Sequence, residues 1–200
     1  MDKPVEDRKL TRRAALTRVV GLGAAVAVGA VAMSTTPASA WSSQTQTGWR
    51  FCNRCFGMIF IDGGAWDTCP AGGQHVAQGW TFQLPYNYST TGGGEDANDQ
   101  ANWRRCVLCS NLFWTTSSSW TAGVCPTGGQ HDCIDNYDRI GLQYLLPHDI
   151  GAPPGTQQWR FCFRCNSLYF DGYQPNRGVC PAGWGHAAAG YLFAIPVYSY

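Results

Sequence analysis

The chain has 200 residues, with 14 lysines and arginines against 13 acidic residues and a formal net charge of +1. This near balance, without any basic stripe along the sequence, argues against a nucleic-acid-binding protein. Ten cysteines and nine each of Trp, Tyr and Phe instead indicate a protein whose fold depends on cysteine chemistry and aromatic packing.

The first 40 residues have the features of an export signal. The pair Arg12-Arg13 precedes an apolar stretch of 15 residues, Val19 to Met33, and Ala38-Ser39-Ala40 is typical of a cleavage site. The twin arginine resembles a Tat signal, and the apolar stretch is shorter than the about 20 residues of a spanning helix. We therefore expect residues 1–40 to be removed as a Tat-type signal peptide. The mature chain is then secreted and extracellular, with no membrane insertion, and the resemblance implies export in a folded, metal-loaded form.

The mature chain is long enough for one domain. It spans 160 residues and contains eight arginines, ten acidic residues and no lysine. Its first segment, residues 41–48, is short, polar and unpatterned, and this predicts a flexible N-terminal arm. Such an arm can add as a strand to a protein partner. The candidate partner-binding residues are Trp41, Ser42, Ser43, Gln44, Thr45, Gln46 and Thr47.

From Trp49 onward one motif occurs three times. Each copy begins with Trp-Arg, continues with Cys-x2-Cys and a short apolar run, and ends with a Cys-x5-His segment that starts with Cys-Pro. The copies occupy residues 49–102, 103–158 and 159–200. Together they form one predicted domain, residues 49–200.

The spacing of three cysteines and one histidine in each copy is that of a zinc site, since zinc prefers a tetrahedron of thiolate and imidazole ligands. The predicted ligands of three structural zinc ions are Cys52, Cys55, Cys69 and His75, then Cys106, Cys109, Cys125 and His131, then Cys162, Cys165, Cys180 and His186. Disulfide bonding is the alternative, but three cysteines per copy leave one unpaired.

Arginines near the motifs, one extra cysteine and one extra histidine lie outside the predicted ligand sets. Six of the eight mature arginines lie within two residues of a Cys-x2-Cys, where they either offset the negative charge of three thiolates or occupy the wet face of a strand. Cys133 has no counterpart in the other copies and is predicted to be inert. His148 is predicted to be a plain surface histidine.

Four short strands are predicted in each copy. The fourth is an alternating run such as Gly79 to Pro85, whose large apolar residues recur with period two. Twelve strands predict an all-β, single-domain β-trefoil of three four-stranded repeats, in which three hairpins close a six-stranded barrel. Three separate zinc-ribbon beads, each of about 42 residues, are the alternative.

The pattern Trp-Arg-x-Cys-x2-Cys followed by Cys-Pro-x-Gly resembles a repeat of secreted actinobacterial and other microbial proteins. That repeat is sometimes appended to enzymes, and the resemblance implies a zinc-binding, trefoil-like module without naming an activity. Actinobacteria also secrete antibacterial toxin particles that contain small adaptor subunits. By this analogy we expect a non-catalytic, protein-binding adaptor of an extracellular multiprotein assembly.

Two other functions stay open at this stage. A lectin for cell-surface glycans would stack sugars on aromatic rings such as Trp66, Trp120 or Tyr173. A hydrolase would use linker acids such as Asp96 or Asp99, but the sequence shows no nucleophile paired with a base.

Overall fold

The computed structural model describes residues 44–61, 67–87, 98–116, 119–134, 141–151 and 156–198. The chain divides into two units, residues 1–35 and 36–200, and all of the described residues belong to the second. The signal peptide, Trp41 to Ser43, Trp66 and Asp96 lie outside the described ranges, so the predictions about them stay predictions.

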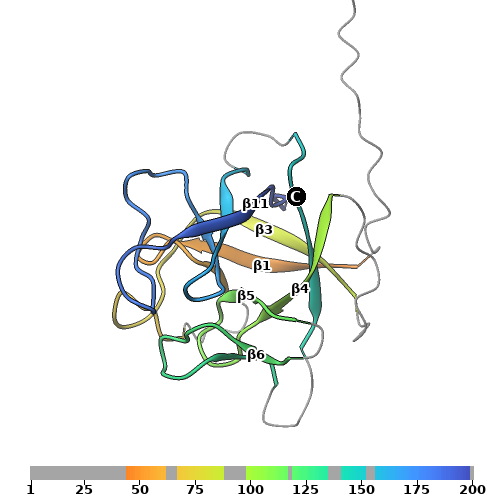
Figure 1. Cartoon of the computed structure of the whole chain (residues 1–200). Helices are drawn as coiled ribbons and strands as arrows, with labels where there is room; N and C mark the ends of the chain where they lie inside the picture. The colour runs from red at the N-terminus through yellow and green to blue at the C-terminus, as the bar shows by residue number, and fades with distance from the viewer. Residues whose placement is uncertain are drawn as a thin grey trace, which may run out of the picture. The chain divides into compact units, whose positions relative to one another are not determined.

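The described part of the chain consists of β-strands and loops, with no helix (Figure 1). The all-β class is therefore confirmed. No segment within these ranges is a helix long and apolar enough to cross a membrane. The strands are β1 (Thr45–Cys52), β2 (Met58–Phe60), β3 (Ala77–Asn87), β4 (Asp99–Arg105), β5 (Leu112–Trp114), β6 (Thr121–Ala122), β7 (His131–Asp132), β8 (Gln143–Pro147), β9 (Trp159–Cys162), β10 (Leu168–Phe170) and β11 (Ala188–Phe193).

Each copy forms the same three-stranded unit. The strand that enters the Cys-x2-Cys turn pairs with the strand that leaves it, in the registers Trp49↔Phe60, Trp103↔Trp114 and Trp159↔Phe170. On its other edge it pairs with the last strand of the copy. The strand orders are β2-β1-β3-β8-β4-β5, β10-β9-β11 and, as a separate pair, β6-β7.

The prediction of four strands per copy is wrong. Within the described ranges the second copy has five strands, whereas the first and third copies have three each. There the expected third and fourth strands are a single strand with a bulge, since β3 pairs with β1 on both sides of Gly79. Gly79 has φ 72° and the equivalent Gly190 of β11 has φ 64°. Glycine adopts these values without steric cost, so the chain bends at the bulge and continues.

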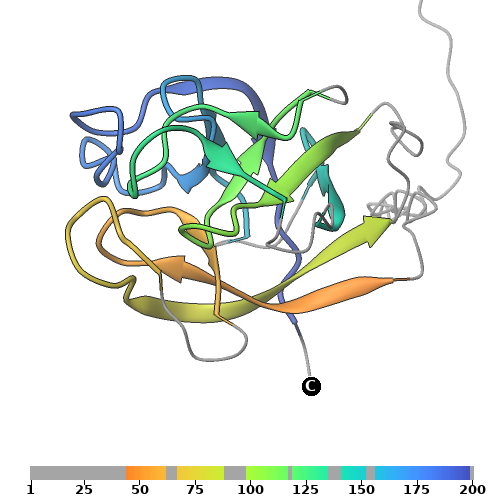
Figure 2. The ribbon, with the colours of Figure 1, turned by 90° about the horizontal axis from the view of Figure 1, so that it is seen from below.

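In the first and second copies, the first strand begins before the predicted start of the copy. Gln46 in β1 pairs with Leu84, and the equivalent Gln100 in β4 pairs with Leu146. Tyr144 also donates a hydrogen bond to the side chain of Gln46. Residues from Thr45 to Gly48 are therefore part of strand β1, which forms a long ribbon with β3 (Figure 2), and the prediction of a flexible arm is wrong for them.

Three short bridges connect the copies in a closed cycle. Ile59 of the first copy pairs with Asn111 of the second, and Phe113 of the second pairs with Ser167 of the third. Tyr169 of the third copy then pairs with Gly57 of the first. In each case, the residue four positions after the second cysteine meets the residue two positions after that cysteine in the next copy.

The largest cluster of buried hydrophobic residues draws on all three copies. It includes Trp49, Trp103 and Trp159, each at most 1% exposed, together with Phe82, Tyr144 and Phe193 from the last strands. Because this core contains residues of all three copies, the copies are not separate beads. The sheets are partly barrel-like, with the metal motifs at the turns.

Candidate metal centres

The structure brings the predicted ligands together in three groups of three cysteines and one histidine. In each group the four ligand atoms lie within 4.8 Å of one another and all four residues are buried. The Sγ atoms of Cys52 and Cys69 are 4.0 Å apart, and the equivalent sulfurs of the second and third groups are 3.9 Å apart. A disulfide needs about 2.05 Å, so these cysteines are unbonded thiols in this structure.

The distances fit a tetrahedral metal ion. Two sulfurs bound to one zinc ion at about 2.3 Å lie about 3.8 Å apart. The sulfur of the second cysteine lies 3.5, 3.3 and 3.5 Å from Nδ1 of His75, His131 and His186. Soft thiolates with one imidazole are ligands that suit zinc. The twelve predicted ligands thus form three candidate metal centres, each able to hold one ion.

The Cys-x2-Cys turns have the same backbone geometry in all copies. Phe56 N–H donates to Cys52 O at 2.8 Å, and Cys52 N–H donates to Gly57 O at 3.0 Å. The residue after the second cysteine has a positive φ, namely 67° at Phe56, 56° at Ser110 and 62° at Asn166. This reversal directs both sulfurs of a turn toward the same ion.

The loop after the third cysteine supplies the other two ligands. Gly72 N–H donates to Cys69 O at 2.9 Å, and Cys69 N–H donates to Gly73 O at 2.8 Å. Gly73 and Gly129 have φ values of 63° and 71°. The third copy has Trp184 at this position, with φ 66° and 88% of its surface exposed.

Each histidine ring contacts two copies. Nδ1 faces the cysteines of its own site, while Nε2 of His75 donates to the carbonyl of Cys109 at 3.1 Å. In the same way, His186 Nε2 donates to Cys55 O at 3.1 Å, and His131 Nε2 lies 3.1 Å from Oγ of Ser167. Metal-bound histidines usually have such a partner, which orients the ring. The ligand spacing does not predict these partners, because they come from the next copy.

The thiols of each group interact strongly with one another. Hydrogen bonding from Cys55 lowers the pKa of Cys52 far below its usual range, and Cys165 has the same effect on Cys162. In the second group, hydrogen bonding from Cys106 lowers the pKa of Cys125. The same hydrogen bonds, together with burial, raise the pKa of Cys55 and Cys165, so an acidic thiol is coupled to one that resists ionisation.

The arginines near the turns have a structural role. Arg50, Arg104 and Arg160 each donate to a glycine carbonyl, Gly79 O, Gly141 O and Gly190 O, at 2.9, 2.8 and 3.2 Å. Arg54 donates to the carbonyls of Gly72 and Ala71 in the ligand loop. These guanidinium groups fix backbone carbonyls of the strands and loops that carry the ligands.

Cys133 lies outside the second ligand group. It is fully buried, and its thiol donates to the carbonyl of Trp120 at 3.3 Å. Burial raises its pKa to about 11. A neutral, inaccessible thiol is unreactive, which agrees with the predicted inert role.

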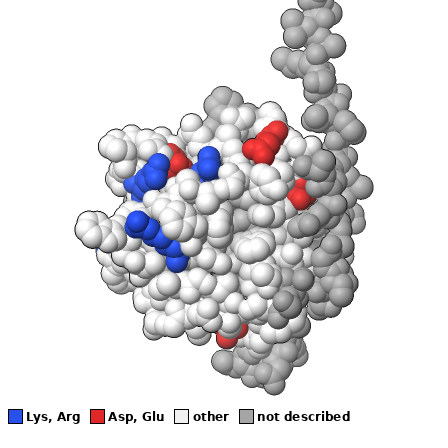
Figure 3. Space-filling model, in the orientation of Figure 1, with Lys and Arg blue, Asp and Glu red and all other residues white. Residues whose placement is uncertain are grey.

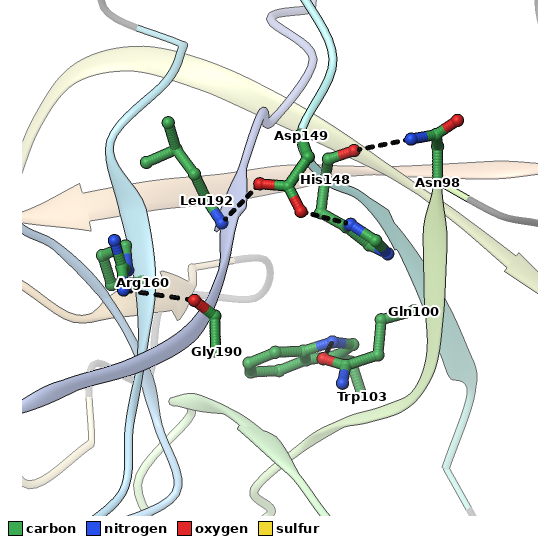
Figure 4. A network of polar contacts seen from close by, with 8 residues as sticks. All are labelled: Asn98, Gln100, Trp103, His148, Asp149, Arg160, Gly190 and Leu192. Atoms are coloured by element: carbon green, nitrogen blue, oxygen red, sulfur yellow. Dashed lines mark hydrogen bonds and ion pairs between the residues drawn. The ribbon is translucent and has the colours of Figure 1, made fainter. Parts of the chain in front are cut away.

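The prediction that His148 is a surface residue is wrong. It is only 5% exposed, and its ring stacks on that of Tyr191 with the ring centres 3.6 Å apart. Its Nδ1 lies 3.0 Å from Oδ2 of Asp149 (Figure 4). Asp149 also accepts a hydrogen bond from Leu192 N–H at 3.2 Å. This network joins β8 of the second copy to β11 of the third.

The aromatic residues proposed for sugar stacking differ in their surroundings. Trp120 is half-buried, with the guanidinium of Arg104 5.6 Å from its ring centre. Tyr173 is 56% exposed and lines a pocket between the first and third copies. Trp66 is outside the described residues.

Comparisons of this chain with protein-family models, with curated proteins and with solved structures gave no match. The three groups of cysteine and histidine support metal-binding repeats, while the resemblance to secreted microbial proteins rests on its motif alone.

Proposed function

We propose that this protein is a secreted, non-catalytic interaction module with three structural zinc ions. It acts as a protein-binding adaptor subunit of an extracellular assembly, such as an antibacterial toxin particle. The three copies form one β-trefoil-like module, and the cycle of bridges from Ile59 through Phe113 to Tyr169 supports this arrangement.

The closed metal groups favour a structural role over catalysis. Each group has four buried protein ligands. A catalytic zinc ion usually has three protein ligands and an open position for water or substrate. With four ligands per ion, the coordination energy serves folding, and about 10–16 kcal/mol is typical of zinc-finger peptides.

The observation that supports protein binding most directly is the exposed apolar surface of the third copy. Of the nine large apolar residues that are exposed in the described ranges, six belong to this copy. Trp184 is 88% and Phe163 is 58% exposed, whereas the first copy has Gly73 and Asn53 at these positions. Exposed aromatic groups of this kind are typical of protein interfaces.

The charge distribution agrees with a protein partner. On the face shown in Figure 3, arginine side chains gather at one side, and most of the surface of the described residues carries no charge. A nucleic-acid-binding surface would instead present an extended basic stripe.

The alternatives have less support. Asp99, an acid suggested for hydrolysis, is 9% exposed in β4, where it pairs with Pro147. A lectin site needs several polar groups around the sugar, but the pocket beside Tyr173 is mainly apolar. Glycan binding stays the second candidate because the exposed ring of Tyr173 can stack on a sugar.

The adaptor function can be tested by purifying the tagged, mature protein gently from the culture supernatant of its own host and weighing it by native mass spectrometry. We expect other secreted proteins in stoichiometric amounts. Phe163→Asn, which introduces the residue of the first copy, should lose them, whereas Leu108→Arg, which removes an exposed apolar residue of the second copy, should retain them. A chain that carries three zinc ions but no other protein would contradict the adaptor function. Its binding to glycans would then be tested on a glycan array.

A further inference from the structure

An aromatic pocket of about 240 Å³ lies between the first and third copies. Phe51 and Phe82 of the first copy contact Trp159 of the third, with ring centres 6.3 and 5.4 Å apart. The rings that line the pocket are those of Phe51, Trp80, Phe82, Trp159, Phe170 and Tyr173.

The lining indicates what the pocket can bind. Its surface is mainly apolar, and Gln78 is the residue with a side-chain amide in the lining. Trp80 and Tyr173 are 48% and 56% exposed, so two of the rings are open to solvent. A flat apolar ring would be enclosed by aromatic edges and faces, whereas the hydroxyl groups of a sugar would find few partners.

The junction between the first and second copies differs at the position of Phe51. The equivalent residue there is Arg105, whose guanidinium lies 5.1 Å from the ring centre of Phe60. Phe60 is the counterpart of Phe170 in the pocket. A charged group thus covers the corresponding aromatic surface, and the two junctions have different chemistry.

Trp184 is an exposed ring that nothing in the described fold requires. It is 88% exposed, and its φ of 66° costs free energy for any residue other than glycine. The other two copies have glycine here and form the same hydrogen-bonded loop. Burial of this ring in a complex would offset the cost of the backbone strain and remove the exposed indole from water.

Trp184 and the pocket lie on either side of one loop. Tyr173 lines the pocket, and Asn176 and Arg177, a few residues later, line the hollow next to Trp184. In a two-fold symmetric dimer, the exposed ring of each molecule can enter the aromatic pocket of the other. Such an interface uses the same surface patch on both molecules, and the assembly stops at two copies.

We propose that Trp184 of one molecule inserts into the aromatic pocket of a second copy, and the reverse, so that the mature protein is a two-fold dimer. This inference rests on the proposed protein-binding function and deepens it, because it names one partner as the chain itself. A reciprocal dimer would present two copies of the remaining adaptor surface.

The test uses the mature, zinc-loaded chain in sedimentation velocity across a range of concentrations. We expect a dimer. Trp184→Gly should raise its dissociation constant about 30-fold or more, as expected for loss of an interface hot spot. Gln78→Trp places a bulky ring at the rim of the pocket and should have the same effect. Leu108→Arg is the matched control, because it also replaces an exposed apolar residue by that of the other two copies, and should leave the dimer intact.

The zinc content of every variant is measured by native mass spectrometry, so that loss of the fold is distinguished from loss of the interface. A monomeric wild-type chain at all concentrations, or a dimer that persists in Trp184→Gly, would overturn the proposal. Binding of glycans or of a foreign protein in the pocket by a monomeric chain would also overturn it. The adaptor function is judged separately from the proteins captured in the host supernatant, so a monomeric adaptor is a distinguishable result.

Discussion

At the scale of single residues, the three copies use equivalent arginines in different environments. Arg104 is 2% exposed, and burial lowers its pKa. Besides donating to Gly141 O, it approaches the side-chain oxygen of Gln143 at 3.4 Å and the ring of Trp120. Arg160 makes the equivalent contact with Gly190 O near the surface. The same hydrogen bond should therefore contribute more to stability in the second copy.

Arg104→Ala is expected to lower the free energy of unfolding by about 2–3 kcal/mol, because it removes a buried side chain and leaves the buried side-chain oxygen of Gln143 without its charged donor. Arg160→Ala should cost about 1 kcal/mol or less. Urea denaturation of the zinc-loaded variants, followed by tryptophan fluorescence, measures the difference. Equal losses would show that burial does not strengthen this contact.

Cys69→Ser should reduce the metal content from three ions to two and lower the thermal stability, because serine is a poor zinc ligand. Cys133→Ser is the control, since Cys133 is equally buried but lies outside the ligand groups. Elemental analysis and native mass spectrometry count the ions. Three ions in Cys69→Ser, or two in Cys133→Ser, would refute the ligand assignment.

The ligand residues could be predicted from the sequence because the same spacing occurs three times. The environment of His148 could not, since the ring of Tyr191 comes next to it only through the bridge between His148 and Phe193. The role of the arginines was ambiguous for the same reason. Their acceptors are glycine carbonyls about 30 residues away, and spacing alone does not bring these together.

At the scale of elements, the segments before the third cysteines pack against the Cys-x2-Cys turn of the next copy. Gly178 has φ 64°, and a Cβ atom there would lie 2.3 Å from the carbonyl oxygen of Cys55. Gly123 is the equivalent residue of the second copy, where a Cβ atom would lie 2.1 Å from Cys165 O. Both glycines allow one copy to support the metal ligands of the following one.

Gly178→Ala is therefore expected to be severely destabilising, by about 3 kcal/mol or more, and to weaken metal retention at the first site. Gly190→Ala has the same positive φ of 64° but meets nothing within 4 Å, so only a backbone cost of about 1 kcal/mol is expected. Thermal unfolding and a zinc-chelator competition compare the two variants. A similar cost for both would show that the close contact with Cys55 is unimportant.

The strands themselves were predicted more accurately than their ends. The alternating run from Gly79 correctly indicated a half-buried strand, but the bulge that joins it to the preceding residues depends on the conformation of Gly79 and on Arg50. Thr45 to Thr47 appeared unpatterned because they are mostly exposed, although their backbone pairs with β3. The alternation of apolar and polar residues cannot reveal a strand segment whose side chains are mostly exposed and which only backbone hydrogen bonds hold in the sheet.

At the scale of the whole molecule, the three metal groups are connected in a cycle. His75 contacts the Cys-x2-Cys turn of the second site, and His186 contacts that of the first. His131 contacts Ser167, which follows the Cys-x2-Cys turn of the third site. An ion held in one site would thus orient a histidine that supports the neighbouring site. The sequence predicted a closed threefold domain from its large apolar residues, but not this coupling between the sites.

Because the sites support one another, we expect the ions to leave together. During titration with a chelator, native mass spectrometry should show mainly the three-zinc and zinc-free chains, with one-zinc and two-zinc chains as minor species. Replacing Ser167 by Ala removes one link and should make the loss more stepwise. A binomial distribution of zinc numbers in the wild type would indicate three independent sites.

The hydrogen bond between His186 and Cys55 connects residues that are 131 positions apart. During synthesis the first copy emerges early, with all four of its own metal ligands, but the donor to its turn is made near the end of translation. Gly178, which packs against the same carbonyl, is also late. The first metal site is therefore completed only when the last part of the chain has been made. In a nascent or truncated protein without residues 178–186, its four ligands would lack the contacts that His186 and Gly178 make with Cys55 O.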